Sequence, residues 1–227
     1  MAMCSGIRRS LAIGLIVAGL TVAAGDDGLA ARLAPEALAR VAFRNDTDRS
    51  IDYLFFSSST SRFWGADVLG PGRPLLPGQT REFYRASGEI ATYDILAIDE
   101  RIDAHLMLRR AVTDDGVITF TNRTLESGFD LPVLATLTVE NRTGTSLWFG
   151  FLSPTDSDAR GVDILGQDTI LFDGRSMTFR IPVGEQEIAF EFVGVDNDGA
   201  LHRATSVLSD RRLRSTATIR AGTRADH

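Results

Sequence analysis

Two aspartates in matching segments are the residues of this sequence best suited to do chemistry. Asp67 and Asp163 each lie in an irregular segment with the pattern G-x-D-x-L-G. Such a carboxylate could bind a hard cation, with Asp99 or Asp196 as a second oxygen ligand. In the alternative, structural interpretation, the aspartates accept backbone N–H bonds, the leucines enter the core and the glycines adopt positive φ. The candidate binding-loop residues are Trp64, Gly65, Asp67, Leu69 and Gly70, with Gly161, Asp163, Leu165 and Gly166 in the second segment.

Two histidines, His105 and His202, also occupy matching places, and one histidine per copy could act as a general base. The usual catalytic and cofactor signatures (G-x-S-x-G, H-E-x-x-H, a P-loop and G-x-G-x-x-G) do not occur. Asp196-Asn197-Asp198-Gly199 resembles the start of a calcium loop, but Val207 stands where the loop needs its glutamate. A hairpin turn is expected there instead, and no cofactor or metal is expected.

Charge and cysteine content exclude some classes of partner and of metal site. The formal net charge is −6, and the chain contains no tract of clustered basic residues. Because binding to a phosphate backbone needs clustered lysine or arginine, nucleic acid is excluded as a partner. Cys4 is the only cysteine and precedes the first apolar run, so disulfides and thiolate metal sites are excluded from the rest of the chain.

The N-terminal segment reads as an export signal. Residues 1–24 combine Arg8 and Arg9 with an uncharged apolar run from Leu11 to Ala24, which is the pattern of a signal peptide. As a helix this run is only about 21 Å long, short of a bilayer core of about 30 Å. We therefore expect a periplasmic or secreted protein, without a membrane span once the signal is removed.

An internal repeat is the strongest organisational feature. Placing each residue over the one 96 positions later aligns 45–83 with 141–179 without a gap. After one inserted residue the match resumes, with 93–99 over 190–196 and His105 over His202. The identical pairs include Asn45/Asn141, Thr47/Thr143, Phe55/Phe151, Ser57/Ser153, Gly65/Gly161, Asp67/Asp163, Leu69/Leu165, Gly70/Gly166, Leu75/Leu171, Gly78/Gly174 and Phe83/Phe179.

Each copy has the periodicity of β-strands. Apolar residues alternate over 51–55 and 147–151, whereas 92–98 and 189–195 are apolar on both faces. Asn45 and Asn141 begin N-x-T turns, in which the side chain bonds its own backbone; Asn122 begins a third N-x-T. The expected fold is all-β, with two tandem copies of a small antiparallel β-sandwich-like domain. The expected boundaries are a signal at 1–24, a linker at 25–39, repeat 1 at 40–121, a linker at 122–135, repeat 2 at 136–220 and a tail at 221–227.

The repeat resembles one found in uncharacterised exported bacterial proteins. The resemblance is carried by an N-x-T turn, a strand ending in Ser-Ser or Ser-Pro, W-G-x-D-x-L-G, and Tyr-Asp before an apolar strand. Arg160 stands in the second copy where the first has Trp64. The resemblance covers nearly all of the chain after the signal and implies an architecture, with no established activity.

From these features we expect a non-catalytic exported binding or scaffold module for a cell-envelope or extracellular protein. Its expected contact surface is the loop 58–78 with its counterpart 154–174. One alternative is a hydrolase or metal-dependent enzyme with a loop site in one copy, which would use His105 or Asp67. The other is a cation-binding envelope sensor built on the paired aspartates.

Overall fold

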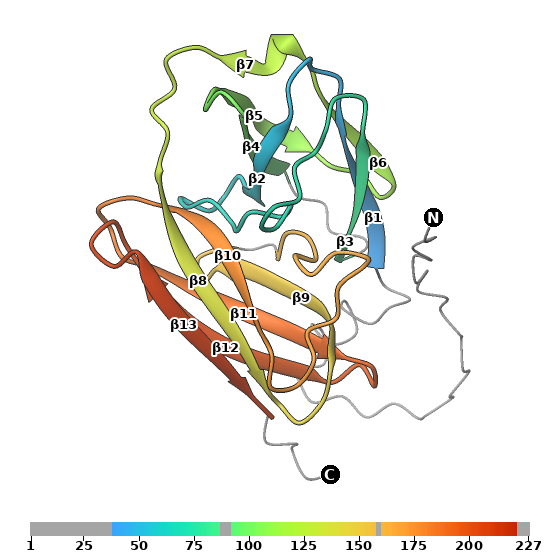
Figure 1. The fold of residues 1–227 in the computed structure, drawn as a ribbon, viewed down its shortest axis with the longest axis vertical. Helices are drawn as coiled ribbons and strands as arrows, with labels where there is room; N and C mark the ends of the chain where they lie inside the picture. Colours follow the sequence, from blue (N-terminus) through green and yellow to red (C-terminus); the bar gives the residue numbers. More distant parts are fainter. Residues whose placement is uncertain (1–37, 87–91, 158–159, 222–227) are drawn as a thin grey trace, which may run out of the picture.

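The protein consists of β-strands in four sheets, grouped into two halves. The computed structural model describes residues 38–86, 92–157 and 160–221 (Figure 1). The predicted signal peptide, most of the first predicted linker and all but the first residue of the predicted tail lie outside the described residues. Among the residues that the structure describes, no helix is long and apolar enough to cross a membrane.

The first half contains two facing sheets. One has the strand order β3-β1-β6 and the other the order β2-β4-β5-β7. Their bounds are Leu38–Asn45 (β1), Ile51–Ser58 (β2), Thr80–Ala86 (β3), Thr92–Asp99 (β4), Ala104–Ala111 (β5), Gly116–Phe120 (β6) and Leu125–Glu126 (β7).

The second half repeats this arrangement, and its sheets have the orders β10-β8-β13 and β12-β11-β9. Strands β8 to β13 therefore take the places of β1 to β6. Their bounds are Val133–Arg142 (β8), Leu147–Pro154 (β9), Ser176–Val183 (β10), Ile188–Asp196 (β11), Leu201–Leu208 (β12) and Arg214–Arg220 (β13).

The all-β prediction is confirmed, with one difference in strand direction. Most pairs are antiparallel, but β1 runs parallel to β6 and β8 runs parallel to β13. The sixth strand of each half follows a strand of the facing sheet. It therefore reaches its neighbour by a crossover and not by a hairpin, which permits the parallel direction. The shared strand order is a property of the structure; the duplication is inferred from the sequence alone.

The segment expected to be a linker, 122–135, is mostly ordered into elements. It holds a 3₁₀ turn at Asn122–Thr124, strand β7 paired with β5, and the first residues of β8. At the other predicted linker, β1 already begins at Leu38. Only residues 127–132 therefore connect the two halves outside these elements.

The two halves share one hydrophobic core. In the first half the ring of Phe43 on β1 packs against Phe56 on the facing sheet, with ring centroids 5.6 Å apart. The same connected cluster of buried side chains continues into the second half through residues such as Val162 and Phe192. We infer that the halves stabilise each other by apolar burial.

A buried asparagine closes the first turn of each half in the way that the N-x-T pattern predicts. The Asn45 carboxamide donates to the carbonyls of Arg49 and Leu75, both at 2.8 Å, and accepts from the Thr47 N–H and hydroxyl at 3.0 and 2.7 Å. Asn141 makes the same four bonds at nearly the same distances. Both side chains are fully buried, so they join the turn to the returning chain where water cannot replace them.

We expect Asn45→Ala and Asn141→Ala each to lower the free energy of unfolding by about 3 kcal/mol, because buried backbone groups lose their partners. Urea denaturation of the purified chain measures this. Asn122→Ala is the matched control, because Asn122 begins the same N-x-T pattern but is exposed; its change should stay within about 0.5 kcal/mol. Equal effects at all three positions would contradict the structural role.

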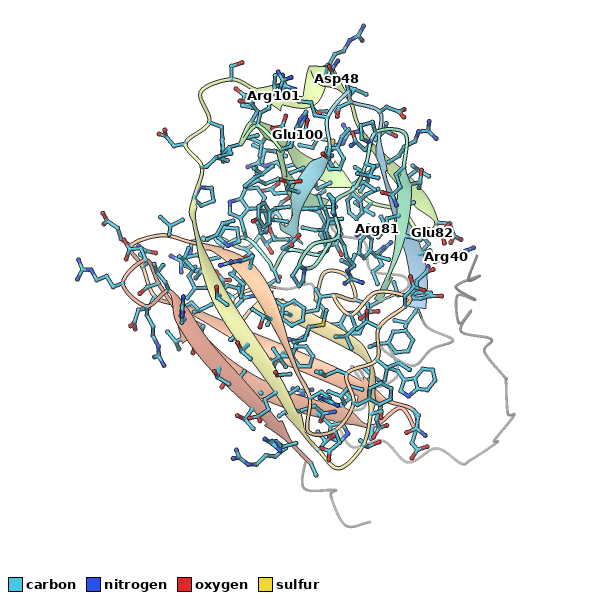
Figure 2. All side chains as sticks on the ribbon, viewed as in Figure 1. Arg40, Asp48, Arg81, Glu82, Glu100 and Arg101 are labelled. Atoms are coloured by element: carbon cyan, nitrogen blue, oxygen red, sulfur yellow. The ribbon has the colours of Figure 1, made fainter. Side chains whose placement is uncertain are left out.

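A strained residue marks one turn of the first half. Ile102 has φ +64° and lies in the turn after β4, which is closed by backbone bonds from Arg101 and Asp103 to the Asp99 carboxylate, both at 2.9 Å. The matching turn of the second half has Gly199 at that place, with φ +80°. A β-branched residue is disfavoured in the left-handed region. The turn lies at the end of the first half away from the second, beside the labelled Glu100 and Arg101 (Figure 2).

We expect Ile102→Gly to raise the free energy of unfolding by about 1 kcal/mol, because glycine adopts this φ without strain. The reciprocal variant Gly199→Ala should lower it by about 1 kcal/mol, since space around that position is open and only the backbone is strained. Chemical denaturation of both variants tests this, and a destabilised Ile102→Gly would refute it.

Candidate functional site

Asp67 organises the loop between β2 and β3. Its carboxylate accepts N–H bonds from Leu54 on β2 at 3.0 Å and from Leu69 in its own loop at 3.1 Å. The loop is also bonded to β2 through its backbone, since the Val68 N–H donates to the Leu54 carbonyl at 2.8 Å. The side chain is 2 % exposed. The carboxylate thus fixes the loop against β2 of its own half.

Asp163 does the same in the second half. It accepts from Gly150 on β9 at 2.8 Å and from Leu165 at 3.1 Å, and the Ile164 N–H donates to the Gly150 carbonyl at 2.8 Å. In both loops the carboxylate accepts backbone bonds, as the structural interpretation predicts. The leucines of both loops are fully buried, also as that interpretation predicts.

Each aspartate presents its own backbone N–H to the other half of the molecule. The Asp67 N–H donates to the Arg180 carbonyl on β10 at 2.8 Å, and the Asp163 N–H donates to the Tyr84 carbonyl on β3 at 2.7 Å. Tyr84 and Arg180 are equivalent under the offset of 96. The two contacts are therefore reciprocal, as in an isologous interface.

The structure brings the two candidate loops together, but it places most of their residues in the interior. Gly65, Gly70 and Gly161 are buried beside the aspartates and leucines, and Gly166 is half-buried. Gly70, Gly161 and Gly166 have positive φ as expected, whereas Gly65 is needed for close approach, because a Cβ there would lie 2.7 Å from the Phe56 carbonyl oxygen.

Trp64 belongs to a separate cluster. It is half-buried and packs against a cluster around Phe55 on the outer face of the β2-β4-β5-β7 sheet. Phe129 and Leu131, from the connection between the halves, pack against the same cluster. Arg160, its counterpart, forms an ion pair with Glu191.

The histidines are buried next to the acidic turns. His105 has Nδ1 3.0 Å from the Thr124 hydroxyl and Nε2 3.7 Å from the Asp99 carboxylate. Burial lowers the pKa of His105, and the Asp99 carboxylate opposes this effect. His202 lies 3.0 Å from Asp196. Within the described residues no hydrogen bond or ion pair joins His105 to Asp67, the two residues on which the hydrolase alternative depends.

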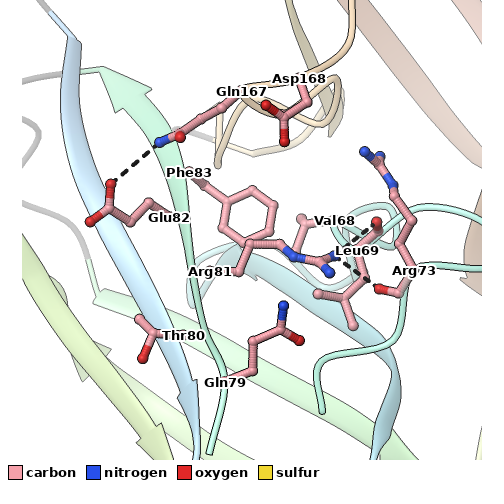
Figure 3. Close-up of a pocket in the computed structure, with 11 residues that line it drawn as sticks. Val68, Leu69, Arg73, Gln79, Thr80, Arg81, Glu82, Phe83, Gln167 and Asp168 are labelled. Carbon is pink, nitrogen blue, oxygen red and sulfur yellow. Dashed lines mark hydrogen bonds between the residues drawn. The ribbon is translucent and has the colours of Figure 1, made fainter. Parts of the chain in front are cut away.

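A polar cleft of about 450 Å³ lies between the halves beside the paired loops. It is lined by residues 68, 69 and 73 of the first loop, by 79–83 on and before β3, and by 166–168 of the second loop (Figure 3). Leu69 and Gly166 connect it to the predicted loop residues. Its volume is within the usual range for ligand pockets, about 300–1,000 Å³.

Groups of both charges line the cleft. Arg81 donates to the carbonyls of Arg73 at 2.9 Å and Leu69 at 3.4 Å, so it holds the first loop against β3. Burial and the nearby Arg73 guanidinium lower the pKa of Arg81, whereas Asp67 and Asp168 raise it. Arg73 also contacts the Thr169 hydroxyl of the second loop at 3.3 Å.

Glu82 on β3 contacts a residue of each half of the molecule. Its carboxylate accepts from Gln167 of the second loop at 3.4 Å and lies 3.5 Å from the Arg40 guanidinium on β1. Figure 2 shows Arg40 and Glu82 close together at this edge of the first half.

Among the described residues, no strand pairs with the outer edge of β3 at Thr80 and Glu82, which faces the cleft, whereas Arg85 near the end of β3 forms an isolated bridge with Val162. Strand β3 is the outermost strand of its sheet, and the Gln79 carbonyl accepts from Asn45 of β1 whereas the Tyr84 carbonyl points away from β1 to accept from Asp163. Because backbone groups alternate in direction along a strand, Thr80 and Glu82 direct their N–H and C=O groups to the same outer edge as Tyr84.

The sequence motifs do not include the polar residues of this cleft. A usable signal was present at positions where the aligned copies differ in charge: Arg73, Arg81 and Glu82 correspond to Thr169, Met177 and Thr178. Among the described residues, no group of three or more histidine, cysteine, aspartate or glutamate side chains is placed to hold a metal ion.

The Asp67 carboxyl has its pKa raised to about 6, mainly by burial, although backbone bonds from Leu54 and Leu69 oppose the shift. The native state therefore retains this proton over a range in which the unfolded chain, with a pKa of 3.8, releases it. The stability contributed at this site is greatest below about pH 4. It falls by about 3 kcal/mol as the pH rises through about 6.

We expect Asp67→Asn to remove this dependence, because the amide oxygen still accepts the N–H bonds but does not titrate. Urea denaturation from pH 4 to pH 8 should show the wild-type chain losing up to about 3 kcal/mol relative to the variant as the pH rises. Parallel curves for the two chains would show that Asp67 keeps an ordinary pKa.

No protein-family model matches the chain, and no curated protein matches it. Among solved structures, it is similar to a carbohydrate-binding module of family CBM26 from Eubacterium rectale Amy13K, crystallised in complex with maltoheptaose. That similarity has 11 % identity and a TM-score of 0.24, covering 82 % of this chain and 94 % of that one. A candidate adhesin from Bacteroides ovatus ATCC 8483 has 11 % identity and a TM-score of 0.20, covering 85 % of this chain and 88 % of that one. At these TM-scores neither similarity indicates what this chain binds.

Proposed function

We propose that the chain is an exported, non-catalytic binding module that holds an extended peptide segment of a cell-envelope or extracellular protein in the cleft between its halves. The observation that carries this proposal is the edge of β3 at Thr80 and Glu82, which faces the cleft and pairs with no strand in the described part of the chain. An unpaired edge supplies backbone donors and acceptors for one more strand, the mode of recognition called β-augmentation.

The polar lining suits such a ligand. A peptide backbone offers donors and acceptors in alternation, and the cleft has amide side chains at Gln79 and Gln167 and charges of both signs at Arg73, Glu82 and Asp168. These groups would contact the side chains of the added strand and give specificity, while the backbone hydrogen bonds would give affinity. The second loop limits the length of the segment, because the Asp163 N–H already occupies the edge at Tyr84.

We expect seven-residue peptides selected from a random display library on the purified chain to lose at least about tenfold in affinity for Glu82→Pro, because proline removes the edge N–H. Glu82→Ala removes the side chain but keeps the backbone N–H, and it should retain most of the affinity. Thr178→Pro is the matched control, since Thr178 occupies the equivalent place on β10. Isothermal titration calorimetry of the four chains gives the affinities, and circular dichroism checks that each is folded.

Equal binding by Glu82→Pro and the wild-type chain would overturn the proposal, as would a library that yields no binder. A loss shared equally by Thr178→Pro would place the peptide elsewhere and would also count against it.

A further inference from the structure

The outer face of the β10-β8-β13 sheet carries an ordered array of polar side chains. Along β8, Ala135, Leu137 and Val139 are buried in the core, and the alternate residues Thr136 and Thr138 face outward. The sheet therefore presents hydroxyl groups to the solvent from its central strand.

The strand registers arrange these residues in rows across the sheet. One row is Arg180, Thr136 and Arg214; the next is Thr178, Thr138 and Thr216; the third is Ser176, Glu140 and Thr218. Neighbouring strands lie about 4.8 Å apart. The result, which we call the Arg/Thr face, is a grid of hydroxyls with two guanidinium groups at one end.

The charge of this face is opposite to that of the chain. A groove of about 610 Å³ runs over Thr136, Thr138, Arg180, Arg212, Arg214, Ser215 and Thr216. In the described part of the chain, no carboxylate forms an ion pair with any of these three arginines, although the formal net charge is −6. Arg180 does donate to the Thr136 hydroxyl at 2.8 Å. Glu140, the one acid in the rows, forms an ion pair with Arg142.

The equivalent sheet of the first half presents a different surface. There the row corresponding to Thr178, Thr138 and Thr216 is Glu82, Ala42 and Val117, and Val117 is 61 % exposed. Its two arginines, Arg40 and Arg44, form ion pairs with carboxylates. The central row of hydroxyls, and arginines without a carboxylate partner among the described residues, are thus not required by the strand order, which both halves share.

We propose that the Arg/Thr face binds an acidic polysaccharide, a polymer with carboxylate groups on its sugars and free ring hydroxyls. Guanidinium groups bind carboxylates through two parallel N–H bonds, and threonine hydroxyls both donate to and accept from sugar hydroxyls. No aromatic ring lies in the three rows, so stacking on neutral sugars or on nucleic-acid bases has no platform there. With the peptide cleft at another site, the module would link a protein segment to an anionic envelope polymer.

The test measures binding of the purified chain to polygalacturonate by isothermal titration calorimetry at low salt. We expect saturable binding that weakens as salt is added. The triple variant Arg180→Gln, Arg212→Gln, Arg214→Gln should bind at least about tenfold more weakly. Arg40→Gln with Arg44→Gln, on the equivalent face of the first half, is the control and should leave the affinity unchanged. All of these side chains are at the surface, so the variants should fold.

Further ligands test whether the face recognises sugar hydroxyls as well as negative charge, and whether the negative charge comes from carboxylate or phosphate groups. Neutral dextran should not bind, and Thr138→Val with Thr216→Val should weaken polygalacturonate but not inorganic polyphosphate. Val133 and Leu213 are exposed at the arginine end of the face. Because apolar side chains beside arginines could also contact an anionic lipid surface, binding to phosphatidylglycerol vesicles is measured as well.

Equal affinity of the wild-type chain and the triple variant for polygalacturonate would overturn the proposal. Stronger binding to the vesicles or to polyphosphate would overturn it too, in favour of a phosphate ligand. Glu82→Pro should leave polygalacturonate binding unchanged, so failure here and failure of the peptide cleft are distinguishable.

Discussion

A buried carboxylate in each half is the interaction on which the rest of the structure depends. Asp67 and Asp163 each fix a loop to the second strand of their own half, and the same residue then donates its backbone N–H to the edge of the other half. Burial disfavours the charged form of Asp67, but the backbone bonds partly compensate. The loops thereby connect the halves, and the apolar residues around them belong to one core that both halves share.

The same contacts leave one edge open. The second loop contacts the edge of β3 at Tyr84 and Arg85, and the first loop contacts the edge of β10 at Arg180. The cleft lies beside this contact and is lined by 79–83 and by 166–168 of the second loop. A free strand edge promotes association unless it is covered, and here charged side chains such as Arg81 and Glu82 flank it. Those charges discourage unselective pairing of the edge with other chains.

The two halves share their buried hydrogen-bonding and core residues and differ in their exposed residues. The buried asparagines, aspartates and leucines occur in both halves with the same partners. The exposed positions of the equivalent sheets have diverged, as Ala42 and Thr138 show. Buried positions are constrained by packing and by hydrogen bonds that water cannot replace. Exposed positions are free of those constraints, and for that reason the proposed binding features are found among them.

The sequence by itself indicated the strands, the repeat and the turn role of its asparagines, because these depend on local alternation and on bonds between near neighbours. It left Asp67 and Asp163 open between cation binding and loop structure, because their carboxylates also bond to Leu54 and Gly150, thirteen residues away. Asn45 bonding to Thr47 could be predicted from two residues. Only the tertiary structure decided that 125–126 adds to a sheet, that β6 and β13 run parallel to their partners, and that Glu82 contacts Gln167 across a cleft. Those features depend on how elements far apart in the chain pack, and packing energy is shared among many residues that no local pattern identifies.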